Sequence, residues 1–165
     1  QFQRAEEQAL LDTGYFIDRA EQLYGYPHFV CDTGGSICEW VDPENEADPI
    51  LSALSGQALM VWIRGSEDHT AELIRRFDRA PKPMAYQPAF LTACWDAYLD
   101  ETGLSPARVD PDAFIRWTYA RALAHRQPLY EAMARNWGVT VDASDVATVR
   151  DEADFNAVIA AALPA

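Results

Sequence analysis

Positive charge and long apolar runs are both scarce in this chain. Its 165 residues include 13 Lys and Arg against 26 Asp and Glu, which gives a net charge of −13. Such a chain repels a phosphate backbone, so we expect no nucleic-acid partner. No apolar stretch approaches the roughly 20 residues that span a bilayer, and the longest, over 58–63, has the length of a strand. We therefore expect no membrane partner either.

Cysteine is also scarce. The chain has three cysteines, Cys31, Cys38 and Cys94, and an odd number cannot form a fully paired disulfide framework. This fits a reducing compartment better than a secreted scaffold, so we expect a cytoplasmic protein. The sequence starts at Gln1, and its methionines occur only at positions 60, 84 and 133. The cysteine usage favours a fragment of a larger cytoplasmic protein over a secreted chain with a cleaved signal peptide.

The apolar content, 49% of the residues, is enough for one sizeable core, and we expect a single domain over 1–165. Apolar runs at 28–32, 58–65 and 138–144 predict three short strands. Helical patterns lie between and around these runs, which favours a helix-rich α/β fold with a three-layer parallel sheet. Three strands are few for such a sheet, so we expect it to be incomplete at the N-terminus.

Capping residues mark the expected helix boundaries. Helices are expected to begin after Ser66 and Asp110, and to end at Gly25, Gly56 and Gly103. The Asp-Thr-Gly triplet at 12–14 lies within helical sequence, so we interpret it as a junction between helices. Pro128 is expected to kink or restart the helix that begins at Pro111.

The stretch HFVCDTGGS, residues 28–36, carries the main candidate site, because the first expected strand ends there on Asp32. Open α/β sheets bind ligands at the carboxyl ends of their strands. Asp32 would hold Mg²⁺ directly or through water, and Gly34 and Gly35 would let the backbone approach phosphate. The hydroxyls of Thr33 and Ser36 suit phosphate or metal-bound water. The alternative interpretation is a tight turn closed by an Asx-type hydrogen bond.

Segment 75–82 carries the densest positive cluster, formed by Arg75, Arg76, Arg79 and Lys82. Guanidinium groups bind phosphate in a bidentate manner and stabilise charge on a transferring phosphoryl group. The segment therefore predicts a phosphate contact. The alternative is a solvated helix face on which the arginines pair with Glu72 and Asp78.

Two other chemistries are disfavoured by the sequence. An aspartic protease needs two carboxylates that share a proton, but the first Asp-Thr-Gly lies in helical sequence and the chain has little alternating strand pattern. A zinc site at His28, Cys31 and Cys38 matches no zinc-ligand spacing. Among the large aromatic residues, Trp62, Trp95 and Trp117 are expected in the core.

Three segments carry a family resemblance: YGYPHFVCDTGGSICEWVDP (24–43), LMVWIRGSEDHTAELIRRFDRAPKPMAYQPAFL (59–91) and DPDAFIRWTYARALAHRQPLYEAMARNWGVTV (110–141). They closely resemble the C-terminal portion of a bacterial family of P-loop ATPases whose role is poorly defined. More distantly, 28–35 and 61–83 resemble small-molecule P-loop kinases of the shikimate-kinase type. The resemblance implies a P-loop NTPase-like fold that uses ATP and Mg²⁺.

By this resemblance, Asp32 is the catalytic acid that positions Mg²⁺. Gly34 and Gly35 form the substrate-facing turn, and the three arginines act as a catalytic, phosphate-clamping lid. From their residue types and positions, Thr33, Ser36 and Lys82 are expected to bind the nucleotide as well. The complete protein is then an ATPase or kinase-like phosphotransferase, whose acceptor is water, a small molecule or a protein.

One motif of that family is absent from the sequence, namely the loop Gly-x-x-x-x-Gly-Lys-Ser/Thr that holds the β and γ phosphates. The family carries this Walker A loop near its N-terminus, ahead of the part that resembles this chain. We therefore expect the chain to be the C-terminal portion of a P-loop NTPase domain, and to be inactive when isolated. The alternative function is a non-catalytic, acidic α/β interaction domain that binds a protein partner.

Overall fold

The computed structural model describes residues 2–164, which form two compact units. Unit 1 comprises the described residues up to Ile63 and those from Leu129 onward, and unit 2 comprises Arg64–Pro128. The chain is 65% helical, and its two described strands form a small parallel sheet. The expected helix-rich α/β class is confirmed at this level. The three-layer P-loop NTPase-like sheet and the single domain stay predictions.

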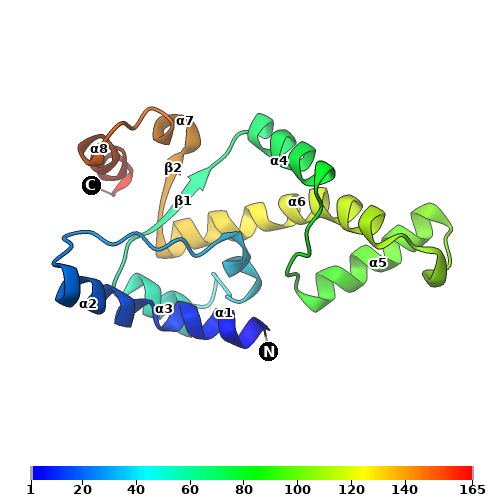
Figure 1. The fold of residues 1–165 in the computed structure, drawn as a ribbon, viewed down its shortest axis with the longest axis horizontal. Helices are drawn as coiled ribbons and strands as arrows, with labels where there is room; N and C mark the ends of the chain where they lie inside the picture. The colour runs from blue at the N-terminus through cyan, green and yellow to red at the C-terminus, as the bar shows by residue number, and fades with distance from the viewer. Residues whose placement is uncertain (1, 165) are drawn as a thin grey trace. The chain divides into compact units, whose positions relative to one another are not determined.

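Unit 1 contains most of the elements (Figure 1). They are α1 (Phe2–Leu11), α2 (Thr13–Tyr24), η1 (Gly35–Glu39), α3 (Pro49–Ser55), β1 (Met60–Arg64, whose last residue belongs to unit 2), β2 (Gly138–Asp142), α7 (Ala143–Val146) and α8 (Glu152–Ala162). Helices α1, α2 and α3 lie against one another, and α7 and α8 lie against β2. The triplet at 12–14 joins α1 to α2, as expected.

The sheet pairs β1 with β2. Gly138 begins β2 so close to the Met60 carbonyl that a Cβ at this position would overlap with it. Further along β2, Val139 and Val141 are buried and alternate with half-buried residues, as the pleat of a strand requires. The strands expected at 58–65 and 138–144 are therefore confirmed, with shorter bounds.

The strand expected at 28–32 is wrong. Residues 27–34 form neither helix nor strand, and Val30 is 84% exposed. A strand needs a neighbour for its N–H and C=O groups, and the described residues supply none here. Asp32 consequently does not end a buried strand, although its place in a glycine turn is as expected.

The core of unit 1 is built around η1 and α3. Its buried members are Leu10, Ile37, Cys38, Val41, Ile50, Leu51, Leu54 and Met133. Asp48 begins α3 by accepting hydrogen bonds from the N–H groups of Ile50 and Leu51. This cap fixes the direction in which α3 enters the core.

Unit 2 contains α4 (Glu67–Arg79), α5 (Pro88–Thr102), η2 (Pro106–Arg108) and the residues of α6 (Pro111–Trp137) up to Pro128. Ser66 caps α4 as expected, and the His69 side chain completes a capping box. The Phe77 and Tyr119 rings stack with centroids 3.8 Å apart. Helix α6 continues through Pro128, so the expected restart of the helix is wrong.

Candidate functional site

The Asp-Thr-Gly-Gly-Ser segment forms an exposed turn that leads into η1. Asp32 Oδ1 accepts a hydrogen bond of 2.9 Å from the Gly34 N–H, which is the Asx-type bond of the alternative interpretation. Gly34 has a φ of 66°, a conformation that favours glycine. Local sequence therefore builds this turn, and the Asp32 side chain is exposed.

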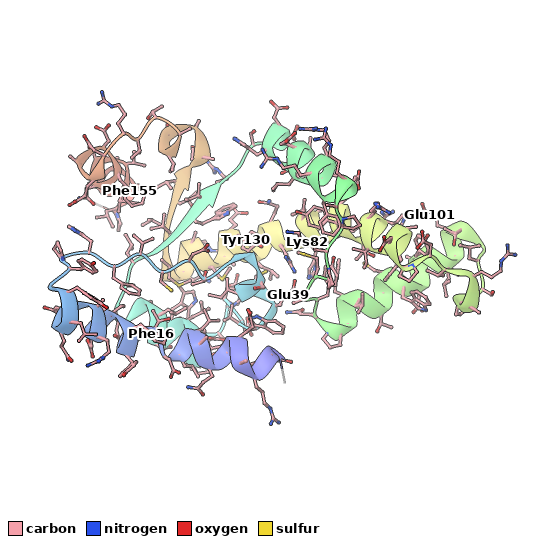
Figure 2. The ribbon with its side chains drawn as sticks, viewed as in Figure 1. Phe16, Glu39, Lys82, Glu101, Tyr130 and Phe155 are labelled. Atoms are coloured by element: carbon pink, nitrogen blue, oxygen red, sulfur yellow. The ribbon has the colours of Figure 1, made fainter. Side chains whose placement is uncertain are left out.

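Two more distant elements hold the turn in place. The Tyr130 hydroxyl on α6, labelled in Figure 2, donates a hydrogen bond of 2.7 Å to the Gly35 carbonyl. The Ser36 hydroxyl donates one of 3.3 Å to Glu6 on α1. The turn is thus fixed from both α6 and α1, although its own residues are mostly exposed.

A pocket of about 290 Å³, here called the β1 pocket, lies on one side of the turn. Its wall is formed by Thr33, Gly34, Gly35, Ile37, residues 60–63 of β1, and Tyr130, Met133 and Ala134 of α6. None of these residues is charged. The pocket therefore lacks the cations that a phosphate group would need.

A second pocket of about 400 Å³, here called the α1 pocket, is bordered by Asp32 and Thr33 together with residues of α1 and α2. Glu6 and Asp32 are its two carboxylates. Mg²⁺ often binds one or two carboxylates and keeps several waters. Asp32, with the hydroxyls beside it, fits such a water-rich site, whereas no group of three His, Cys, Asp or Glu side chains gathers within residues 2–164.

The positive cluster lies on α4 and just after it, in unit 2. Arg75 makes two hydrogen bonds of 2.6 Å to Glu72, and Arg76 Nε makes one of 2.7 Å to the same carboxylate. The hydrogen bonds from Arg75 and then from Arg76 lower the pKa of Glu72. For these two arginines the structure therefore shows the helix-face pairing of the alternative interpretation.

The other two cations of the cluster differ. Arg79 and Lys82 are exposed and have no hydrogen bond or ion pair within the described part of the chain. The expected pairing with Asp78 is not seen there, and the Asp78 carbonyl instead accepts a hydrogen bond from Arg116. Arg79 and Lys82 are consequently the cations of this cluster that are most accessible to an anionic ligand.

The structure brings Asp32, Thr33, Gly34, Gly35 and Ser36 together in one turn of unit 1. The arginines and Lys82 belong to unit 2. Of the residues considered for a zinc site, His28 has its Nδ1 atom 3.5 Å from Oε1 of Glu152, and Cys38 is buried.

The sequence analysis missed the wall of the β1 pocket. Trp62, expected in the core, is half-buried and lines this pocket, and Tyr130 was not considered. A signal for Trp62 existed, since it lies at the centre of the best-defined strand. No local signal links Tyr130 to the turn, because it lies far away in the sequence.

No protein-family model, curated protein or solved structure matches this chain. Within the described residues, no helix is long and apolar enough to cross a membrane.

Proposed function

We propose that this chain is the C-terminal part of a P-loop ATPase or kinase-like phosphotransferase that acts with Mg²⁺. The observation that carries the proposal is the exposed turn at 32–36, which places a carboxylate, hydroxyls and bare glycine backbone beside two pockets.

Each residue of the turn has a role in this proposal. Asp32 directs Mg²⁺, either as a ligand or through water, and Thr33 and Ser36 hold water or phosphate oxygens by their hydroxyls. ATP, when bound, supplies the phosphoryl group. The Walker A loop would come from outside this sequence, so the isolated chain is expected to bind ATP poorly.

Within unit 2, Arg79 and Lys82 are the members of the positive cluster that are open to a phosphate, because they have no competing partner in the described residues. Arg75 and Arg76 would have to leave Glu72 before they meet a phosphate. Substitution of Arg79 should therefore weaken Mg-ATP binding more than substitution of Arg75. Arg108→Ala is the matched control, since this exposed arginine lies outside the cluster.

Calorimetry of Mg-ATP binding to this chain and to the natural full-length protein tests the proposal. Binding by the full-length protein that is lost in Asp32→Ala would support it. Asp12→Ala is the matched control, because it removes a carboxylate of the same kind from the other Asp-Thr-Gly triplet, which joins α1 to α2. If the full-length protein binds no Mg-ATP, or if Asp32→Ala binds as well as Asp12→Ala, the proposal is wrong.

An acidic interaction domain is the second candidate, and a specific observation favours it. Exposed aromatic and aliphatic side chains gather on α2 and the segment after it: Tyr15, Phe16, Leu23, Tyr24, Tyr26, Phe29 and Val30. Large exposed apolar patches often mark protein contacts. If the full-length protein binds no Mg-ATP, this candidate becomes the working hypothesis.

A further inference from the structure

We propose that the β1 pocket binds a neutral, planar aromatic or heteroaromatic ring. The ring belongs either to a nucleobase or to an aromatic small molecule, since both offer the same flat face. This inference goes beyond the proposed ATPase, because it concerns a pocket that Asp32 does not line. It would hold for a binding protein as well as for an enzyme.

The charge of the pocket excludes a phosphate from its interior. Its wall has no charged side chain, and the chain as a whole has a net charge of −13. An anion placed against such a wall loses part of its hydration and gains no charged partner. The enclosed part of a ligand must therefore be uncharged, and any charged group must lie outside this pocket.

The residue types of the wall favour aromatic over aliphatic ligands. Trp62 of β1 and Tyr130 of α6 both line the pocket, with ring centroids 6.3 Å apart and planes tilted by 38°. They are accompanied by Met60 and Met133, whose thioethers make favourable contacts with ring edges. Two aromatic rings and two sulfur atoms form a polarisable wall that suits another flat π-system.

The turn gives the pocket a polar edge. Gly34 carries no side chain, so a ring can approach the backbone of the turn closely there; an added Cβ at Gly34 would meet only the Ser36 hydroxyl, at 3.8 Å. The position beside Gly35 is instead filled by the Tyr130 hydroxyl, which would lie 2.8 Å from an added Cβ. The volume of about 290 Å³ is at the low end for ligand pockets and suits a one- or two-ring group.

Binding of uncharged probes to this chain, without Mg²⁺ or phosphate, tests the inference. The probes are adenosine, indole and the non-aromatic cyclohexanol, titrated by calorimetry. Stacking on an aromatic side chain is worth about 1–3 kcal/mol per base. Trp62→Leu and Tyr130→Leu should each weaken ring binding by about tenfold.

A matched control variant and a second measurement distinguish loss of the ring site from loss of folding. Tyr24→Leu removes an aromatic ring that is 66% exposed and outside the pocket, so it should leave binding unchanged. In the unmodified protein, probe binding should shift the NMR signal of the Trp62 indole N–H. The signals of Trp95 and Trp117, which do not line the pocket, should not move.

Each outcome decides between alternatives. Tighter binding of adenosine indicates a nucleobase, and tighter binding of indole indicates an aromatic small molecule; both support the ring site. No ring binding, equal binding of cyclohexanol, or a shift confined to other tryptophans would overturn it. The ATPase proposal is tested separately, by measuring Mg-ATP binding to the full-length protein.

Discussion

Replacing Asp48 by alanine should lower the free energy of unfolding by about 2–4 kcal/mol. The side chain of Asp48 is only 6% exposed. Its Oδ1 accepts hydrogen bonds from the N–H groups of Ile50 and Leu51 at 3.0 and 2.9 Å, and its Oδ2 accepts one from Asp42 at 2.9 Å. One carboxylate thus satisfies three backbone donors.

The magnitude follows from these three bonds. Loss of a side-chain N-cap costs about 0.5–2 kcal/mol. A donor left without a partner in a buried position costs about 1–3 kcal/mol more, and the Asp42 N–H is partly buried. Asp48→Asn keeps the Oδ1 acceptor and loses only the bond from the Asp42 N–H, so it should cost about 1–3 kcal/mol, less than Asp48→Ala.

Urea denaturation followed by far-UV circular dichroism and tryptophan fluorescence measures these differences. Asp18→Ala is the control, because it removes the same charge from an exposed position on α2. It should stay within about 0.5 kcal/mol of the parent protein. If Asp48→Ala were as stable as Asp18→Ala, the carboxylate would not hold the start of α3, and the reasoning would be refuted.

Four further predictions concern other parts of the structure. Leu51→Ala should lower the free energy of unfolding, measured by urea denaturation, by about 2–5 kcal/mol, because Leu51 is 0% exposed. Leu59, which is 46% exposed, is the control: Leu59→Ala should cost far less, and equal losses would contradict the described core. Ser66→Ala should speed amide hydrogen exchange in the first turn of α4, because it removes the cap, at a cost of about 0.5–2 kcal/mol; unchanged exchange would argue against the capping box. Gly34→Ala should lower stability by about 1–2 kcal/mol because φ is 66° there, whereas Gly65→Ala, where φ is not positive, lacks this backbone penalty; a neutral Gly34→Ala would mean that the turn has another conformation. Burial raises the pKa of Cys94 above its usual 9.0 and that of Tyr119 above 10.0, so stability should fall as the pH rises past about 9 for Cys94 and past about 10 for Tyr119. Cys94→Ala should show a shallower loss of stability between pH 8 and 10, and an identical slope would contradict the burial of this thiol.

Local signals predicted the helices well. Gly25 and Gly103 end α2 and α5 with positive φ, and Ser66 begins α4, because each of these features depends on a few neighbouring residues. The pairing of Arg75 with Glu72 could be named as an alternative from the sequence because it too is local: side chains three residues apart on a helix lie next to each other.

Features that depend on distant residues were not predictable in this way. The strand at 28–32 was wrong because apolar composition does not say whether a neighbouring strand exists, and Val30 is left exposed. The β1 pocket could not be derived, because Tyr130 and Gly35 are 95 residues apart in the sequence. The turn itself was predicted, whereas the aromatic wall beside it required the folded chain.

The three cysteines have unequal surroundings, and this gives the turn a natural attachment point. Cys31 is exposed, whereas Cys38 and Cys94 are buried. A maleimide dye or a nitroxide spin label should therefore attach at one position of the unmodified chain, next to Asp32. Its emission or its line shape would then report ligand arrival and local motion at the turn, with no engineered residue in the protein.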